Sequence, residues 1–322
     1  MKDENKLMSV YLVIGGAGFI GSHLVEALAQ HGHQVRVLDN LSFGDRENLP
    51  RTAPKIQFLE GDASDPTAVA SVLDGVDGVF HLASTSSVQL SMEDPIRNQR
   101  SGEAATLVIL DQCRKARIKR LVFSSSAAVY GDFPESPKHE QAPLQPRSPY
   151  AVSKVAGELY CKLFAMSGGP DTASLRYFNV FGPRQRPSSP YSGVISIFLD
   201  CLRRKTAPTI YGDGRQTRDF ISVHDVVHAN VLAMENTAPL QGECFNVATG
   251  RSIAILEVWK QLCDIANIRL EPQLVETRPG DIRNSSASIE KSRKALGFHP
   301  MKRYSDALRE LAESVPGATQ TQ

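Results

Sequence analysis

The sequence lacks any cysteine arrangement that would hold a metal ion or a disulfide framework. Its cysteines form no CxxC pair, and no cluster of cysteine and histidine has metal-ligand spacing. Their odd number and wide spacing favour reduced thiols in a cytoplasmic protein. We therefore expect no metal site. The five cysteines are Cys113, Cys161, Cys201, Cys244 and Cys263.

A long hydrophobic run is also missing. Residues 1–8 are mostly polar and charged, and the first apolar run, 10–14, is far too short to span a bilayer. The formal net charge is only +1, so the charge balance predicts no broad surface for nucleic acid or membrane. We expect a cytoplasmic protein whose partners include neither.

Short β-branched runs alternate with amphipathic stretches in the first half of the chain. Near-continuous apolar strands separated by helices predict an α/β fold with a Rossmann-type doubly wound parallel sheet. The predicted strands are residues 10–14, 34–38, 56–59, 79–82, 121–125 and 174–177, and the predicted helices are residues 19–31, 96–116 and 150–165.

The second half is less regular. Residues 131–149 hold five prolines and predict a loop, residues 194–204 and 253–266 predict helices, and residues 210–218 predict a glycine-rich turn region. We expect an NAD-binding domain at residues 1–180, with segments returning to it at about 217–250. Residues 181–216 and 251–322 are then a smaller C-terminal α/β lobe that binds substrate.

A glycine-rich turn joins the first predicted strand to the first predicted helix. Gly15, Gly18 and Gly21 are spaced one residue wider than in G-x-G-x-x-G. Glycines there permit a tight turn, a close approach to a pyrophosphate and close packing of helix on strand. The start of the helix presents free N–H groups to the phosphates. The pattern predicts a dinucleotide site, although glycines alone are also compatible with a simple tight turn.

Two aspartates end the next two predicted strands. Asp39 can accept both ribose hydroxyls and would repel a 2′-phosphate, which favours NAD over NADP. Asp62 is placed to meet the adenine edge. The alternatives are a solvated turn residue for Asp39 and a helix N-cap for Asp62.

Tyr150 and Lys154 lie four residues apart on a predicted helix and so share one face. A tyrosine normally titrates near ~10, and a nearby ammonium lowers that value toward neutral pH. Ser126 ends a predicted strand, where active-site groups of doubly wound sheets gather, and its hydroxyl can share a proton with a substrate. These three residues are the predicted catalytic group, and a surface pair is the alternative for Tyr150 and Lys154.

Motifs along nearly the whole chain resemble the extended short-chain dehydrogenase/reductases, and within them the UDP-sugar 4-epimerases. The motifs are residues 15–23, 124–131 (SSSAAVYG), 150–154 (YAVSK), 176–185 (RYFNVFGPRQ), 211–225 (YGDGRQTRDFISVHD) and 278–281 (RPGD).

The resemblance implies a mechanism. Tyr150, helped by Ser126, takes the proton of the sugar 4-hydroxyl while hydride passes from C4 to a tightly held NAD. The 4-keto sugar then turns, and hydride returns to its other face. Family members commonly form a homodimer through a four-helix bundle, here with residues of about 98–116 and 150–166.

The resemblance also extends the set of site residues. Tyr177 and Phe178 would lie beside the nicotinamide, and Arg218 and Arg278 would hold the diphosphate. Both arginines could instead make only local contacts. The full cofactor set is Gly15, Gly18, Phe19, Ile20, Gly21, Asp39, Asn40, Asp62, Ala63, Leu82, Ala83, Ser84, Tyr150, Lys154 and Tyr177. The substrate set is Ser87, Ser126, Asn179, Gln185, Val194, Thr209, Arg218, Arg278, Asp281 and Ser285.

Three positions bear on the exact activity. Ala128 stands where related dehydratases and decarboxylases carry an acidic residue, and Ser285 leaves room beside the sugar C2 substituent. Ala128 thus gives no support for a dehydratase or decarboxylase. The space beside Ser285 favours an epimerase that interconverts UDP-N-acetylglucosamine and UDP-N-acetylgalactosamine, with UDP-glucose and UDP-galactose as further substrates. The alternatives are an epimerase for UDP-glucose only or for UDP-glucuronate, a 4-ketosugar reductase, and a non-catalytic NAD-binding protein. Gly102 replaces a family asparagine near the cofactor, which weakens the expectation of tight nicotinamide binding.

Overall fold

The computed structural model describes residues 8–50, 55–85, 87–185, 193–277 and 283–315. The chain separates into two compact units. The first unit contains residues 1–125, 148–175 and 230–244, and the second contains residues 126–147, 176–229 and 245–322. The predicted domain boundaries differ in detail from these units and stay a prediction.

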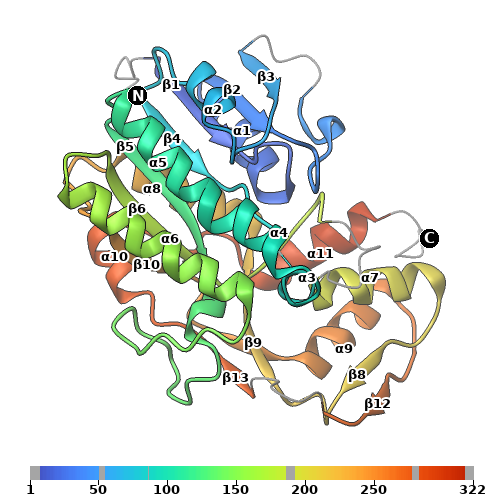
Figure 1. Cartoon of the computed structure of the whole chain (residues 1–322). Coiled ribbons are helices and arrows are strands. Elements are labelled where there is room, and N and C mark those ends of the chain that lie inside the picture. The colour runs from blue at the N-terminus through green and yellow to red at the C-terminus, as the bar shows by residue number, and fades with distance from the viewer. Residues whose placement is uncertain (1–7, 51–54, 86, 186–192, 278–282, 316–322) are drawn as a thin grey trace. The chain divides into compact units, whose positions relative to one another are not determined.

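A seven-stranded sheet forms the centre of the first unit (Figure 1). Its strand order is β10-β6-β5-β4-β1-β2-β3, and β1 pairs in parallel with both β2 and β4. The order reverses between β1 and β4, and ligands of such sheets bind at the carboxyl ends of the strands beside this point. The strands are β1 (Val10–Ile14), β2 (Gln34–Asp39), β3 (Ile56–Glu60), β4 (Gly78–His81), β5 (Arg120–Ser126), β6 (Asp171–Tyr177) and β10 (Glu243–Val247).

Helices cover this sheet, and one of them departs from the prediction. The predicted helix 96–116 is divided into α4 (Pro95–Gln99), a π-helical turn (Arg100–Ala104) and α5 (Ala105–Lys115). The short helices α2 (Pro66–Ser71) and α3 (Val88–Glu93) were not predicted, because six residues are too few for an amphipathic pattern. The longer helices α1 (Phe19–Gln30) and α6 (Pro149–Met166) follow the prediction closely.

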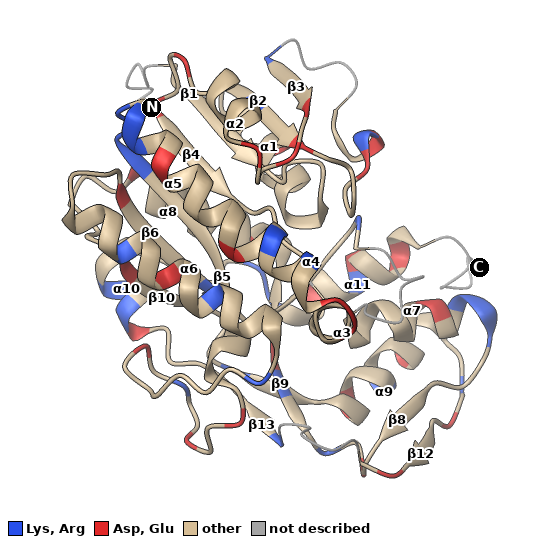
Figure 2. Cartoon of the chain, viewed as in Figure 1, with Lys and Arg blue, Asp and Glu red and all other residues tan. Residues whose placement is uncertain are grey.

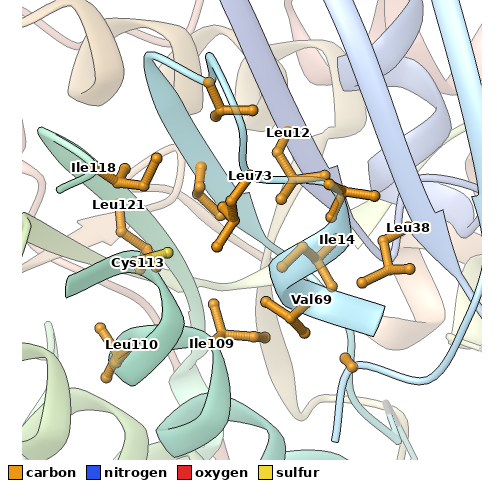
Figure 3. Close-up of a cluster of buried hydrophobic side chains, with 14 of the residues drawn as sticks. Leu12, Ile14, Leu38, Val69, Leu73, Ile109, Leu110, Cys113, Ile118 and Leu121 are labelled. Carbon is orange, nitrogen blue, oxygen red and sulfur yellow. The ribbon is translucent and has the colours of Figure 1, made fainter. Parts of the chain in front are cut away.

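The core of the first unit explains why β1 contains no charged residue and is apolar along its whole length. Side chains of β1, α2 and α5 meet in one buried cluster that includes Leu12, Val69 and Ile109 (Figure 3). Tyr11 and Val13, whose side chains point to the opposite face of β1, are buried as well. Because both faces of the strand are covered, its sequence is continuously apolar.

The second unit is built around short strands. β9 (Thr217–Ser222) is flanked by β11 (Ser252–Ala254) and β13 (Asn284–Ser285), and β7 (Asn179–Phe181) pairs with it as well. β8 (Thr209–Tyr211) and β12 (Gln273–Val275) form a separate pair, so the predicted turn region 210–218 also contains parts of two strands. A three-residue strand is too short to show alternation, which is why the sequence did not reveal β8.

Only two of the described helices of this unit, α7 (Val194–Arg204) and α9 (Ile255–Ala266), correspond to predicted helices. α7 matches its prediction, and α9 begins two residues late. Their apolar faces pack together with α11 (Tyr304–Ser314) around Trp259. The remaining helices are α8 (Val223–Glu235), which runs between the two units in sequence, and α10 (Glu290–Leu296). In the described part of the chain, no helix has both the length and the hydropathy to cross a membrane.

Candidate active site

The glycine turn between β1 and α1 is closed by backbone contacts that leave no space for a side chain. Gly15 N–H donates to Leu38 O at 2.9 Å, and Gly15 has a φ of +82°. A Cβ on Gly15 would lie 2.6 Å from Ala83 N, and a Cβ on Gly21 would lie 2.1 Å from Gly15 O. Both positions therefore require glycine, and the turn exposes backbone N–H groups at the start of α1.

Asp39 ends β2 directly beside this turn. Its Oδ2 accepts a hydrogen bond from Ala17 N–H at 2.9 Å, and its Oδ1 accepts one from Leu41 N–H at 2.8 Å. The side chain is only 8% exposed, so it is not the solvated turn residue that was the alternative. Each carboxylate oxygen keeps a second lone pair that could accept a ribose hydroxyl.

Asn40, which follows β2, and Asp62, which lies two residues after β3, are hydrogen-bonded to each other. Asn40 Nδ2 donates to Asp62 Oδ2 at 3.0 Å, and Asp62 Oδ1 accepts bonds from the Ser64 N–H and hydroxyl. The Ser64 N–H bond holds the pKa of Asp62 below its ordinary value. The N-cap of α2 is Asp65, so Asp62 does not cap that helix.

Lys154 and Tyr150 share a face of α6, which begins after the N-cap Ser148. Lys154 Nζ donates to Ser124 O at 2.6 Å and lies 5.7 Å from the Tyr150 ring centroid. The ammonium also lies 5.0 Å from the Phe123 ring centroid. Burial lowers the pKa of Lys154 to about 7. Lys154 is buried and Tyr150 is partly buried, so the surface alternative is wrong for Lys154.

Ser126 is the last residue of β5. Its Oγ accepts a bond from Ala128 N–H at 3.1 Å and so caps the short turn formed by Ala127–Tyr130. The preceding Ser125 donates to Glu158 of α6, which is buried. Of these adjacent serines, Ser125 thus serves the first unit and Ser126 begins the second.

The other predicted cofactor residues lie mainly at the carboxyl ends of the strands of the seven-stranded sheet. This is the edge where doubly wound sheets bind their ligands. Phe19 and Ile20 begin α1, Ala63 follows β3, Leu82, Ala83 and Ser84 follow β4, and Tyr177 ends β6.

Three predicted substrate residues lie on adjoining strands of the second unit. Arg218 of β9 is paired in parallel register with Ser285 of β13. Further along β9, Asn179 of β7 is paired with Phe220, and its Nδ2 donates to Asp219 O at 2.9 Å. The pairing of β7 and β13 with β9 thus brings together predicted substrate residues that are far apart in sequence.

The remaining predicted substrate residues are less closely grouped. Gln185 accepts a bond from Ser196 Oγ at 2.8 Å and donates to Val180 O at 3.2 Å. Ser87 belongs to the first unit, where it is the N-cap of α3. Val194 begins α7 and Thr209 begins β8. Arg278 and Asp281 lie outside the described residues.

Comparison with known proteins gives the family. The family model described as "NAD dependent epimerase/dehydratase family" matches residues 11–248. The chain belongs to this family.

Three relatives of this NAD-dependent epimerase/dehydratase are similar over almost their full length. A UDP-glucose 4-epimerase of Mycolicibacterium smegmatis is 35% identical over 94% of this chain and 97% of its own. A solved UDP-N-acetylglucosamine 4-epimerase of Methanobrevibacter ruminantium, in complex with UDP-N-acetylmuramic acid, is 38% identical with a TM-score of 0.90, covering 94% of this chain and 97% of that chain. A UDP-glucose 4-epimerase of Thermus thermophilus, solved with NAD, is 36% identical with a TM-score of 0.84 and the same coverage.

These likenesses confirm the predicted family, the Rossmann-type fold and NAD as the cofactor. They also confirm an isomerase of the UDP-sugar 4-epimerase type. The relatives are named for both UDP-glucose and UDP-N-acetylglucosamine, so the sugar is a separate question.

The family departure at Gly102 has a local cause in the packing of the epimerase. A Cβ on Gly102 would lie 3.0 Å from the Cβ of Ser153, the residue before Lys154. Ser153 Oγ accepts a bond from the buried Asn98 Nδ2 at 2.9 Å. An asparagine is therefore present one turn earlier than the family position, and it reaches α6 through Ser153. No sequence motif singles out Asn98, although it lies one helical turn before Gly102.

His81 is a second residue that the sequence analysis missed. Thr106 Oγ1 donates to Gly102 O at 2.7 Å, so His81 Nε2 is the donor in its 2.9 Å contact with Thr106 Oγ1. Burial lowers the pKa of His81 to about 3, with a further contribution from Lys154, so the imidazole is neutral at pH 7. The signal was its place at the end of β4, immediately before the predicted cofactor residues.

Proposed function

We propose that the chain interconverts UDP-N-acetylglucosamine and UDP-N-acetylgalactosamine by inverting C4. The observation that carries the choice of sugar is the pairing of Ser285 with Arg218 on neighbouring strands. If Arg218 holds the diphosphate, the small Ser285 side chain lies near the sugar and leaves space for an N-acetyl group. UDP-glucose and UDP-galactose, which are smaller at C2, would also fit. As in the sequence-based prediction, the enzyme would work in the cytoplasm.

The residues of the first unit fit NAD. The first N–H groups of α1 have no partner within the helix and could bind a pyrophosphate, and Asp39 accepts a bond from Ala17 of the adjoining turn. When bound, NAD supplies the acceptor for the C4 hydride and the donor for its return.

The chain's own residues move the proton. Tyr150 would take the proton from the 4-hydroxyl, with Ser126 sharing a hydrogen bond with the same oxygen. The Lys154 ammonium, 5.7 Å from the Tyr150 ring centroid, stabilises the phenolate form of Tyr150. Its bond to Ser124 O fixes the ammonium on β5, so the charge stays beside the tyrosine.

The test is an incubation of the purified protein with either N-acetylhexosamine nucleotide and no added reductant, followed by product identification. Equilibration from both directions is expected. A panel with UDP-glucose and UDP-glucuronate separates the alternatives, and consumption of NADH with a 4-keto substrate would instead indicate a reductase. Ser285→Tyr should abolish turnover of the N-acetylated pair and spare UDP-glucose. Turnover of the N-acetylated pair by that variant would refute the assigned role of Ser285, whereas no isomerisation by the wild type would refute the whole proposal.

We also propose a homodimer formed through α5 and α6. Figure 2 shows that most of the α6 ribbon is uncharged. Apolar side chains stand in a row along this helix, at Val152, Leu159, Leu163 and Met166, and each is about half exposed or more. Leu107 of α5 is exposed as well. An apolar face of this kind on two packed helices suits a second copy of the same face.

The dimer is tested by Leu159→Glu with Leu163→Glu. Two buried carboxylates on each subunit would oppose association, so the double variant should sediment as a monomer. Leu274→Glu is the matched control, because Leu274 is 52% exposed but lies in the second unit. A wild-type protein that is monomeric at micromolar concentration would refute the proposal.

A further inference from the structure

Asp219 is fully buried in β9, between Arg218 and Phe220. Its Oδ1 accepts bonds from Thr249 N–H at 2.8 Å and from Thr249 Oγ1 at 2.6 Å, and its Oδ2 accepts one from Gly250 N–H at 2.9 Å. The backbone N–H of Ala287 also donates to this carboxylate. One side chain thus binds the segments that follow β10 and β13 to the middle of β9.

Three predicted substrate residues lie close to Asp219. Ala287 lies two residues after Ser285, so its bond to Asp219 holds the end of β13 against β9. Arg218 precedes Asp219 in the same strand. Asn179 Nδ2 donates to the backbone oxygen of Asp219. Arg218, Ser285 and Asn179 therefore have Asp219 as their common neighbour.

We propose that Asp219 is a positioning residue that fixes Arg218, Ser285 and Asn179 in the arrangement that binds the UDP-sugar. The proposal rests on the proposed function. A carboxylate is suited to this role because it is an acceptor only, and all the groups that it meets are donors. An amide in its place would present an NH2 group to some of these donors, and the loops at Thr249 and Ala287 would lose their fixed distance from β9.

The test compares Asp219→Asn with Asp225→Asn. Asp225 is an equally buried carboxylate of the second unit, and its Oδ1 accepts bonds from Met301 N–H and Lys302 N–H, far in sequence from the substrate set. Both variants lose a buried carboxylate, and both should lower the melting temperature. Only Asp219→Asn should raise KM for the UDP-sugar, by about tenfold or more, with kcat changed by less than about threefold.

Two further measurements distinguish a failure of the proposed function from a failure of the role proposed for Asp219. Bound NAD should be the same in both variants and the wild type, because the bonds of the Asp219 side chain described above are to Thr249, Gly250 and Ala287, none of which is a predicted cofactor residue. Binding of UDP alone, measured by calorimetry, should weaken in Asp219→Asn only. If the wild type neither binds UDP nor turns over any UDP-sugar, the proposed function fails. If the wild type does both and the two variants have the same KM, the role of Asp219 is refuted.

A milder variant covers the case in which Asp219→Asn does not fold. Thr249→Val keeps the shape of the side chain and the backbone bond but removes the 2.6 Å hydroxyl bond to Asp219. A rise in KM of about two- to fivefold is expected, with kcat unchanged. An unchanged KM in this variant would contradict the proposal even without the aspartate substitution.

Discussion

Lys154 in the first unit and Asp219 in the second are both buried charged groups, but their surroundings differ. The Lys154 ammonium donates to one carbonyl oxygen, Ser124 O, and otherwise faces the rings of Phe123 and Tyr150. The Asp219 carboxylate accepts bonds from two N–H groups and a hydroxyl at Thr249 and Gly250.

The difference corresponds to two kinds of work. Burial moves the pKa of each group toward its neutral form, lowering that of Lys154 to about 7 and raising that of Asp219. For Asp219 the bonds from Thr249 and Gly250 act against this change. Lys154, which is proposed to lower the pKa of Tyr150, has few hydrogen bonds that would fix its own protonation state. Asp219, which is proposed to hold strands together, accepts several hydrogen bonds that favour its charged form.

Substitution of the catalytic pair should give the largest effect and should differ in kind from substitution of Asp219. Tyr150→Phe removes the proposed proton acceptor, and Lys154→Met removes the charge that is proposed to lower the pKa of the tyrosine. Each should lower kcat by about a thousandfold, while KM for the UDP-sugar changes little.

Steady-state kinetics with product analysis would measure this, and the NAD content of each variant would serve as the control. Tyr150→Phe should retain NAD. If Tyr150→Phe or Lys154→Met raised KM and left kcat unchanged, the expected contrast with the KM effect of Asp219→Asn would be refuted.

The pH dependence of stability should give the next largest effect. Below about pH 7 Lys154 is charged in both states, and the folded protein carries the full cost of burying that charge. Between pH 7 and the ordinary lysine pKa of 10.5, the unfolded chain binds a proton that the folded chain has lost. Stability therefore rises with pH across this range, by about 1.4 kcal/mol for each unit of pKa difference at most.

Urea unfolding of the wild type and Lys154→Met at several pH values measures this. As the pH rises, the free energy of unfolding of the wild type should increase relative to that of the variant. The neighbouring groups that also bear on the titration are Glu158 and Cys161 of α6, Tyr150 and the neutral His81. Parallel curves for the two proteins would mean that Lys154 does not titrate in this range.

The sequence was most informative where an element has a strong local signal. The apolar strand β1 and the glycines after it identify the cofactor turn, because the backbone there permits no other residue. Asp219 gave no such signal. Its partners Thr249, Gly250 and Ala287 lie 30 to 68 positions away, and only the strand pairing brings them to it. A local sequence pattern indicates the conformation of its own segment. The role of a buried residue such as Asp219 depends on which distant segments the fold brings to it.

The same limit applies to the π-helical turn, and it gives the smallest predicted effect. Gly102→Ala adds a Cβ that would lie 3.0 Å from the Cβ of Ser153, next to Lys154. Crowding of this kind costs about 1–3 kcal/mol, and the better helix propensity of alanine returns up to about 1 kcal/mol. A net loss of about 1 kcal/mol in the free energy of unfolding is expected from these two effects. The same change in a Ser153→Gly background should cost less, because the opposing Cβ is gone. An equal cost in both backgrounds would show that Gly102 is required for the backbone of the turn rather than for its approach to α6.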